Sequence, residues 1–544
     1  MNQAPATSGC IGLLDYTVIL LYFVVVFWMA WWATHRQRHL CETSQGYFLA
    51  GRNAGWFVVG ASLFASNIGA EHLVGLAGAG AVNGIAVGQF EILASLILLL
   101  LGWMFVPFYL KSQVYTMPEF LERRYSSGAR LWLSVVSVIS YALTKISVTL
   151  AAGGIVFESL MGLSFWTGAF IVVSATGLYT ILGGMPAVIY TDLMQMFVFI
   201  IGAVTVTVAG LIAVGGWEVM YETAGSRFFD MWQPISDPNF PWTGILFGAP
   251  ILGVWYWCTD QYMVQRVLAA KDESHARRGS IFSGYLKILP VFIFVLPGII
   301  AYCLAQQGRL ELAKPDHALP ALVGTLLPTG LRGLVVAGLL AALMSSLSAI
   351  FNSCSTLITF DIYQKIYPRT TDQQLVLVGR LTTALLVICG LMWIPFMKTI
   401  SPQLYQYLQS VQAYISPPIA AVFLLGIFFK RLNGRGAMAA LICGFVLGIG
   451  RLLAEINKDQ FTGLWYHFAS INFLHFAIFL FIVCSAVLVG VSLTAPQASE
   501  EKLANLTYST RRFAVANPAW RRRDIQLSFT LAALVGLVWL YFSE

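Results

Sequence analysis

The most informative shortage in this sequence is charge. Only 10% of the 544 residues are Asp, Glu, Lys or Arg, whereas a soluble domain carries about 25%. Hydrophobic residues make up 58% of the chain, and long apolar runs recur from end to end. A helix needs about 20 apolar residues to cross a bilayer core. The composition therefore excludes a soluble globular protein and predicts an all-α polytopic membrane protein.

Other absences narrow the class of function. Six of the eight cysteines fall inside apolar segments without paired spacing, which excludes a disulfide framework or a cysteine metal site. The longest aqueous segments, 215–241 and 494–524, are too short for a soluble catalytic domain. Glu71 and His72 lack the companion residues of a metalloprotease or Ser/Lys site, so an enzyme is not expected. The function is therefore expected within the bilayer.

Apolar segments predict fourteen transmembrane helices. They cover residues 13–33, 55–80, 83–110, 128–160, 165–182, 188–214, 242–266, 279–306, 332–362, 375–396, 400–428, 435–455, 470–493 and 525–542. Of the 32 Lys and Arg, 23 fall in loops or near span ends on one side of this alternation, 7 on the other, and only Lys145 and Lys287 lie deep within spans. The positive-inside rule then places both termini outside. The net charge of +7 thus reflects membrane topology and does not indicate nucleic-acid binding.

Two polar interruptions in matching places predict an internal repeat. Segments 55–214 and 242–428 each contain five spans, and the first span of each carries unexpected polar residues. These residues are Asn67, Glu71 and His72 in the first half and the sequence WYWCTDQY at 255–262 in the second. Paired interrupted helices are typical of secondary transporters with inverted repeats. We expect one transporter domain over 1–544, with extra helices at 13–33 and within 435–542.

The first interruption lies in FASNIGAEHLVGLAGAGAVNG, residues 64–84. Close helix packing through small residues accounts for Gly75, Gly78 and Gly80. It does not account for Asn67 or Glu71, whose polar groups lipid cannot satisfy. An unwound segment lining a hydrated cavity explains both features, because it exposes carbonyls and polar side chains as ligands.

A second polar group is the serine cluster in GLLAALMSSLSAIFNS, residues 338–353. Ser345 and Ser348 share one helix face at a spacing of three, and Ser346 lies between them. Hydroxyl and carbonyl oxygens are the ligands that hard cations such as Na⁺ prefer. The alternative is that these serines bond to carbonyls of their own helix.

Isolated polar residues occur in otherwise apolar spans. They are Glu91, Lys145, Asp192, Lys287 and Gln409, and each is a functional candidate because charge within a membrane is expensive. Lys287 can pair with Glu91 and still keep free donors. Aromatic neighbours Phe90, Tyr256, Trp257 and Tyr405 would suit the C–H faces of a sugar, although interfacial placement explains most such residues.

Taken together, five stretches resemble the sodium/glucose cotransporters of the solute:sodium symporter family. They are GASLFASNIGAEHLVGLAG (60–78), WYWCTDQYMVQRVLAAK (255–271), GYLKILPVFIFVLPG (284–298), MSSLSAIFNSCSTLITFDIY (344–363) and SPPIAAVFLLGIFFKR (416–431). The resemblance runs in order from about residue 15 to 495. It implies a LeuT-like five-plus-five inverted repeat and Na⁺-coupled sugar uptake by alternating access. Shorter loops at 306–331 and 456–469, without cysteines, favour a bacterial relative.

The resemblance also implies residue roles. The main Na⁺ site corresponds to the carbonyls of Ala65, Ile68 and Ala342 and the hydroxyls of Ser345 and Ser346. The sugar contacts correspond to Asn67, His72, Glu91, Tyr256, Trp257, Lys287 and Gln409, with Phe90 and Tyr405 as gates. A second Na⁺ site would use Asp192, Ser345 and Ser348. Because Ala349 occupies its other hydroxyl position, the sequence favours one Na⁺ per sugar.

Three departures from the family pattern affect the choice of cargo. Glu71 stands where animal glucose carriers have glycine, and Gly253 and Gln412 each replace a threonine near the sugar pocket. Alternatives with the same chemistry are myo-inositol, sialic acid or another polar solute; a sensor or a channel would be a different class. The expected partners are sugar, Na⁺ and the lipid bilayer of the cell membrane, and a monomer is expected to suffice for transport.

Overall fold

The computed structural model describes residues 11–36, 42–69, 71–393, 404–510 and 518–543. In these ranges the elements are helical and no strand forms beyond one isolated bridge between Ala54 and Ala270. The α-helices are α1 (Leu13–Arg36), α3 (Ser44–Leu49), α4 (Trp56–Asn67), α5 (Ala77–Asn83), α6 (Gln89–Leu100), α7 (Val106–Ser112), α8 (Met117–Arg124), α9 (Ser127–Ser140), α10 (Ser147–Ser159), α11 (Phe165–Val214), α12 (Trp217–Ala224), α13 (Ala249–Gly253), α14 (Gln261–Leu268), α15 (Glu273–Leu286), α16 (Leu296–Gln306), α17 (Ala318–Leu326), α18 (Leu331–Leu357), α19 (Gln364–Ile366), α20 (Asp372–Trp393), α21 (Leu404–Phe428), α22 (Gly434–Ile456), α23 (Gly463–Ala469), α24 (Phe473–Leu493), α25 (Glu500–Leu503) and α26 (Pro518–Tyr541). The all-α prediction is confirmed.

Ten helical segments of the described chain are long and apolar enough to cross a membrane. Shorter apolar helices occupy the rest of the predicted spans, at Trp56–Asn67, Ser127–Ser140, Val148–Ser159 and Gly244–Thr259. Each predicted span therefore overlaps a helix, while the number of crossings stays a prediction.

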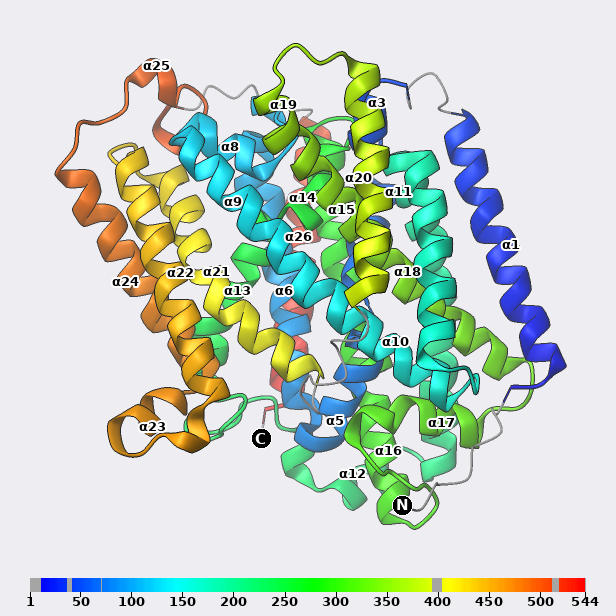
Figure 1. Cartoon of the computed structure of the whole chain (residues 1–544). Helices are drawn as coiled ribbons and strands as arrows, with labels where there is room; N and C mark the ends of the chain where they lie inside the picture. Colours follow the sequence, from blue (N-terminus) through cyan, green and yellow to red (C-terminus); the bar gives the residue numbers. More distant parts are fainter. Residues whose placement is uncertain (1–10, 37–41, 70, 394–403, 511–517, 544) are drawn as a thin grey trace.

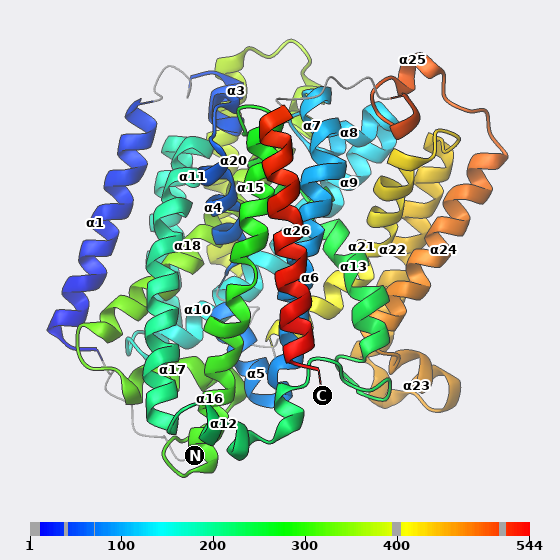
Figure 2. The same cartoon turned by 180° about the vertical axis from the view of Figure 1, so that it is seen from behind.

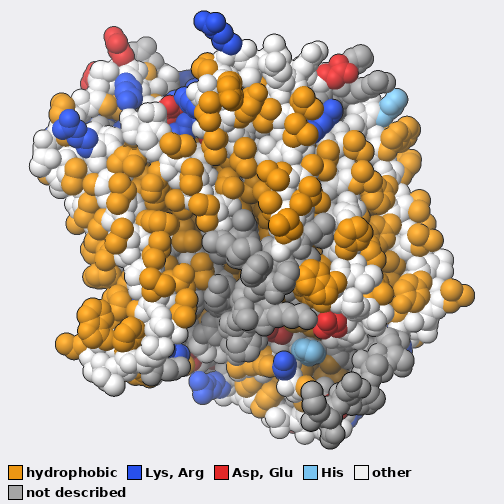
Figure 3. All heavy atoms as spheres, viewed as in Figure 1, with side chains coloured by type: hydrophobic (Ala, Val, Ile, Leu, Met, Phe, Trp, Pro, Cys, Tyr) orange, Lys and Arg blue, Asp and Glu red, His pale blue; other side chains and the backbone are white. Residues whose placement is uncertain are grey.

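The molecule has an apolar outer surface, and its largely hydrophobic interior also buries polar residues. Hydrophobic side chains cover the middle of the face in Figure 3, and charged side chains gather near its upper and lower rims. Nearly all of α18 is buried, whereas only 28% of α1 and 22% of α26 are buried within their most apolar windows. The exposed residues include Leu20, Ile212 and Phe529. Contact with the hydrocarbon core of a bilayer requires an apolar surface of this kind.

The long helix α11 is bent at Gly184. A straight helix of its 50 residues would measure about 75 Å, far more than a bilayer core of about 30 Å. Gly184 has φ 55° and ψ −150°, a backbone conformation that side chains with a Cβ rarely adopt. The bend separates arms 165–183 and 185–214, which correspond to two predicted spans.

Both predicted interruptions are present. After α4 ends at Asn67, the chain leaves the helix and resumes it in a π-helical turn, η2 (Glu71–Leu76), followed by α5. In the second half, the π-helical segment η8 (Val254–Thr259) ends at Asp260, whose φ −77° and ψ 128° are extended, before α14 begins. The two breaks meet, because the Tyr262 hydroxyl donates to the Ser66 carbonyl.

The ends of the bundle lie on the same side of the molecule. In Figure 1, α1 starts and α26 ends at the lower face, together with α12, α17 and α23. Helices α3, α8, α19 and α25 lie at the upper face, and Figure 2 gives the same arrangement from behind. Both views place α1 and α24 at opposite edges, so the interrupted helices lie between them.

Candidate solute and sodium sites

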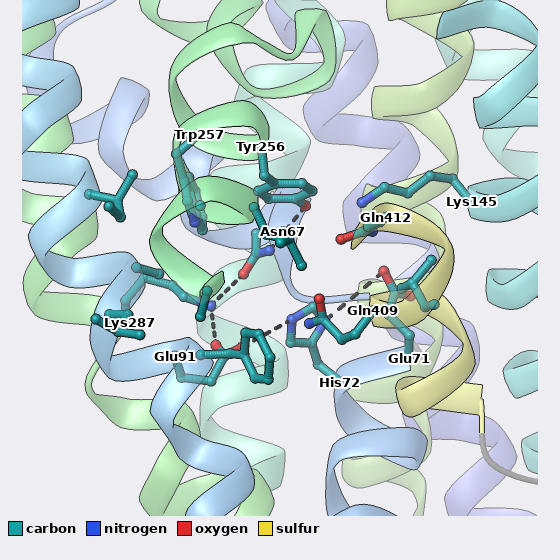
Figure 4. Close-up of a pocket in the computed structure, with 18 residues that line it drawn as sticks. Asn67, Glu71, His72, Glu91, Lys145, Tyr256, Trp257, Lys287, Gln409 and Gln412 are labelled. Atoms are coloured by element: carbon teal, nitrogen blue, oxygen red, sulfur yellow. Dashed lines mark hydrogen bonds and ion pairs between the residues drawn. The ribbon is translucent and has the colours of Figure 1, made fainter. Parts of the chain in front are cut away.

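A cavity lies beside the two helix breaks. Space not filled by protein atoms there amounts to about 600 Å³, part of it open to solvent. The predicted sugar contacts all line it: Asn67, His72, Glu91, Tyr256, Trp257, Lys287 and Gln409. They come from α4, η2, α6, η8, the end of α15 and α21, and Figure 4 shows them converging.

The centre of one wall is the Lys287 ammonium. It donates to Asn67 Oδ1 at 2.5 Å and also to Glu91 Oε2. Both charged side chains are almost completely buried, with 1% of Lys287 and 4% of Glu91 exposed. A buried ion pair is tolerated only when further hydrogen bonds satisfy its remaining groups. Asn67 supplies one of these bonds, so the predicted Lys287–Glu91 pair is confirmed as a three-residue network.

Two further residues extend this network across the pocket. The Asn67 amide donates to the Tyr256 hydroxyl at 3.0 Å, and His72 Nε2 lies 3.4 Å from Glu91 Oε1. The charges of Glu91 and Lys287 are therefore held by neighbours while amide, hydroxyl and imidazole groups face the cavity (Figure 4). This mixture of donors and acceptors matches a solute with many hydroxyl groups.

Aromatic side chains border the same cavity. The Lys287 ammonium lies 5.5 Å from the centre of the Trp257 ring. The ring of Tyr256 packs against that of Trp257, with 5.2 Å between their centres. Phe90, one predicted gate, lines the cavity and stacks on Phe473 of α24 at 6.4 Å. Phe90 thus separates the cavity from α24. The other predicted gate, Tyr405, has a side chain outside the described residues.

The first break releases the two carbonyls predicted for Na⁺. In a continuous helix, the Gly69 amide would bond to Ala65 and the His72 amide to Ile68. Instead Gly69 N donates to Asn67 O at 3.0 Å, and His72 N donates to Gly69 O at 3.0 Å. The carbonyls of Ala65 and Ile68 therefore lose their usual helical partners and are free to serve as ligands.

Facing this break, α18 presents the serine cluster. The Ser346 hydroxyl lies 3.5 Å from the Ser66 carbonyl, one residue from Ala65. The Ser345 hydroxyl donates to Asp192 Oδ1 at 2.6 Å. Ala342 lies one turn earlier on the buried face of α18. The structure thus places Ser346 beside the end of α4 and Ser345 beside Asp192, while the five-oxygen Na⁺ site stays a prediction.

Asp192 connects this region to a buried cation. Its Oδ2 accepts hydrogen bonds from Ser62 at 2.6 Å and Ser66 at 3.0 Å. Arg266 lies 3.8 Å from the same oxygen and donates to the Ser66 hydroxyl at 2.6 Å. Arg266 therefore balances the charge of the Asp192 carboxylate, and both carboxylate oxygens accept hydrogen bonds from serines.

The second predicted Na⁺ site is only partly assembled. Asp192 and Ser345 are in contact, but the Ser348 hydroxyl donates to the carbonyl of Ser345 at 2.9 Å, as a helical serine often does. Ala349, also buried, supplies no oxygen.

Three polar residues of the cavity have no role in the predicted sugar site. Glu71, Lys145 and Gln412 line it together with the seven predicted contacts. Each is visible in the sequence as a polar residue within a span, but spacing along the chain gives no sign that they meet. They come from three different elements, η2 (Glu71–Leu76), the π-helical segment Tyr141–Ile146 and α21.

A bundle of apolar helices with a polar cavity beside two helix breaks is typical of a membrane transporter. Residues 47–444 match the Sodium:solute symporter family. The chain belongs to this family and is a Na⁺-coupled solute symporter of the membrane. Its relatives include sodium/glucose cotransporter 1 of Ovis aries, 40% identical over 91% of this chain and 81% of that protein. Sodium/myo-inositol cotransporter 2 of Oryctolagus cuniculus is 39% identical over 93% and 80%.

Solved structures share the fold. A Na⁺-coupled sialic acid symporter in a substrate-bound outward-open state superposes with a TM-score of 0.76 at 21% identity, covering 90% of this chain and 99% of that one. A nucleobase-cation-symport-1 family transporter in a closed conformation gives a TM-score of 0.52 at 15% identity, over 85% and 97%. At these identities the likeness establishes the architecture and leaves the solute open.

Proposed function

We propose that this symporter couples the inward movement of one Na⁺ to uptake of a neutral monosaccharide of the glucose or galactose type. The observation that carries the proposal is the Lys287–Asn67–Glu91 network, which lines a cavity bordered by Tyr256 and Trp257. Sugar hydroxyls both donate and accept, and sugar C–H faces stack on aromatic rings. The animal relatives with glucose in their names support the same choice.

The charge balance of the pocket favours a neutral solute. Glu71 and Glu91 are matched by Lys145 and Lys287, with His72 between them. An anionic cargo such as sialic acid would need an uncompensated cation, and Lys287 is already paired with Glu91. A cyclitol such as myo-inositol is the second candidate, because it is neutral, ring-shaped and named in a relative that is 39% identical.

The segment at 65–72 links the ion to the solute. Na⁺ would bind the carbonyls of Ala65 and Ile68, Ala342 on the facing helix, and the hydroxyls of Ser345 and Ser346. Asn67 and His72 belong to the same segment, so ordering it by Na⁺ fixes two solute contacts at once. Binding of either ligand then favours binding of the other, and alternating access carries both inward.

We infer a topology of fourteen spans with both termini outside. The two helix breaks at matching places support an inverted repeat of 55–214 and 242–428, with extra helices at 13–33 and within 435–542. A single chain contains both the solute cavity and the Na⁺ ligands, so a monomer suffices in this proposal.

One Na⁺ supplies enough energy for uptake. A charge crossing 100 mV yields about 2.3 kcal/mol, and a tenfold concentration ratio adds about 1.4 kcal/mol. Together they support solute accumulation on the order of several hundred-fold. The incomplete second site is therefore not required.

Uptake into proteoliposomes tests the proposal. Radiolabelled glucose, galactose, myo-inositol and sialic acid are offered with an inward gradient of Na⁺ or K⁺. Saturable uptake of a hexose that needs Na⁺ is expected. Equal uptake in Na⁺ and K⁺ would refute sodium coupling, uptake of myo-inositol alone would replace the hexose by a cyclitol, and flux that never saturates would indicate a channel.

A further inference from the structure

Three consecutive arginines, Arg521, Arg522 and Arg523, stand near the start of α26. All three side chains are exposed, and no described residue forms a hydrogen bond or an ion pair with them. Like charges on neighbouring residues repel one another, so this arginine triplet attracts anions from its surroundings.

The carboxylate next to the triplet is already occupied by other cations. Asp524 follows the triplet directly and is completely buried. Its oxygens accept hydrogen bonds from Arg278 at 2.9 Å and from Arg277 at 3.3 Å, both on α15. Arg277 also pairs with Glu273 at 2.8 Å. Asp524 and Glu273 thus balance the two arginines of α15, and the charge of the triplet stays uncompensated.

The two guanidinium groups of α15 also lack acceptors. The Nη2 atoms of Arg277 and Arg278 are buried and have no hydrogen-bond partner among the described residues. Arg278 lies over the Trp520 ring, 3.9 Å from its centre, and Trp520 directly precedes the triplet. One end of α26 therefore gathers an arginine cluster whose N–H groups are not all satisfied by the protein.

The rest of α26 places this cluster at the edge of a bilayer. Figure 2 shows α26 along the front of the molecule, beside α15 and with its first residues at the upper face. Arg522 shares a helix face with Ile525 and Phe529, three and seven residues later, which are exposed hydrophobic residues. Tryptophans such as Trp520 are typical of the interface between acyl chains and headgroups. The guanidinium groups thus lie at the level of the headgroups, next to an apolar face suited to acyl chains.

An anionic phospholipid matches each part of this surface. Its phosphate oxygens accept hydrogen bonds from arginine in bidentate geometry, and its net negative charge offsets the triplet. Its acyl chains cover the apolar face of α26. A zwitterionic lipid offers the same phosphate but adds a cation beside it, and a free phosphate ion has no acyl chains.

We propose that the arginine triplet, together with Arg278 and Trp520, forms a binding site for the headgroup of an anionic phospholipid. The site lies on the lipid-facing surface, apart from the residues that line the solute cavity. It does not depend on which solute the symporter carries.

Native mass spectrometry of the whole protein, titrated with phosphatidylglycerol in detergent micelles, measures the apparent affinity for an anionic lipid. Phosphatidylcholine is the reference and is expected to bind more weakly. Arg522→Gln is expected to lower the affinity for phosphatidylglycerol about fivefold, and replacement of all three arginines by glutamine on the order of 100-fold, because each basic residue at a membrane surface adds a similar attraction. Replacement of the triplet by three lysines keeps most of the affinity, because the charge remains.

The matched control replaces three other exposed arginines by glutamine, on the side of the predicted spans that also holds the triplet: Arg36, Arg369 and Arg435. Its affinity is expected to stay within about twofold of the unaltered protein, because salt screens distant charges. Equal loss in this control would reduce the effect to net charge and overturn the site.

Two further results would also overturn the inference. One is equal affinity of the unaltered protein for the two lipids, or unchanged affinity in both Arg522→Gln and the triple glutamine variant. The other is displacement of phosphatidylglycerol by an excess of inorganic phosphate, which would indicate a site for the free ion. The measurement requires no transport, so its result is independent of the proposed solute.

Discussion

The buried Lys287 ammonium is neutralised by Glu91 inside the cavity, and the arrangement of the neighbouring solute contacts depends on this ion pair. Its ammonium donates hydrogen bonds to Asn67 and Glu91, and all three side chains are buried. Removing one partner of a buried ion pair leaves the other charged and desolvated, at a cost of about 3–5 kcal/mol. Removing both relieves that penalty.

Lys287→Met is therefore expected to abolish uptake and to destabilise the protein by about 3 kcal/mol, whereas the Glu91→Gln, Lys287→Met double variant regains most of the stability but no uptake. Thermal unfolding in detergent and uptake in proteoliposomes measure the two effects. A double variant no more stable than Lys287→Met would show that the pair is not coupled as the structure indicates.

Ser346 provides a test of the Na⁺ site at the same scale. Loss of a hydroxyl ligand to a cation is worth about 1.5–3 kcal/mol, so Ser346→Ala is expected to raise the half-saturating Na⁺ concentration at least about tenfold. Ser353→Ala is the control, because Ser353 lies two turns along α18 and bonds to Gln265. Unchanged Na⁺ dependence in Ser346→Ala would remove this serine from the ion site.

Sequence reasoning reached the residues whose chemistry is unusual in a membrane. Lys287 and Glu91 are costly in lipid, so each signals a partner, and the structure joins them. Lys145 and Glu71 carry the same signal, but their place on one cavity follows the end of α4 at Asn67, after which Glu71 begins a π-helical turn. Spacing rules assume a continuous helix and therefore cannot place them.

At the scale of elements, the glycines after the first break allow α5 to lie close to its neighbours. A Cβ at Gly80 would meet the carbonyl of Val295, and one at Gly78 would meet the backbone of Asp316. On the facing helix α16, a Cβ at Gly298 would meet the backbone of Ala77 and Ala81. The packing role anticipated for Gly78 and Gly80 is confirmed, because backbone atoms on both sides occupy the space.

Gly298→Ala is expected to destabilise the protein by about 1–3 kcal/mol, since neither backbone can give way without separating α5 from α16. The melting temperature in detergent measures this effect. Gly536→Ala on α26 is the control, because nothing lies within contact distance of an added Cβ there. Equal melting temperatures for the two variants would mean that α5 and α16 pack less closely than the structure shows.

The breaks themselves were predictable as elements, and their exact geometry was not. Polar residues within apolar spans indicate that a helix is interrupted, as at Asn67 and at WYWCTDQY. The π-helical turns η2 and η8 that follow or precede the breaks leave no comparable signal in the sequence. The bend of α11 at Gly184, by contrast, falls between two predicted spans and two residues before Pro186.

For the whole molecule, the distribution of basic residues predicts which face is cytoplasmic. Arg123 and Arg124 on α8 and Lys365 on α19 belong to the upper face of Figure 1, and α12 belongs to the lower face. The positive-inside rule assigns the upper face to the cytoplasm. The alternation of predicted spans places α8 and α19 on one side of the membrane and α12 on the other, and the structure places these helices on the same two sides.

Cysteine labelling in intact cells is the measurement for this orientation. In a background without the eight native cysteines, a cysteine at Glu222 of α12 is expected to react with an impermeant thiol reagent, and one at Lys365 only after permeabilisation. The reverse pattern would invert the topology.

The shared face of the first and last membrane helices has a practical consequence for protein engineering. Because α1 begins where α26 ends, two copies can be joined head to tail by a flexible linker that never has to cross the bilayer. In such a tandem, one copy can carry Lys287→Met, which is expected to abolish its uptake, while the other is unaltered. Half of the normal maximal uptake rate would then identify each copy as an independent transport unit.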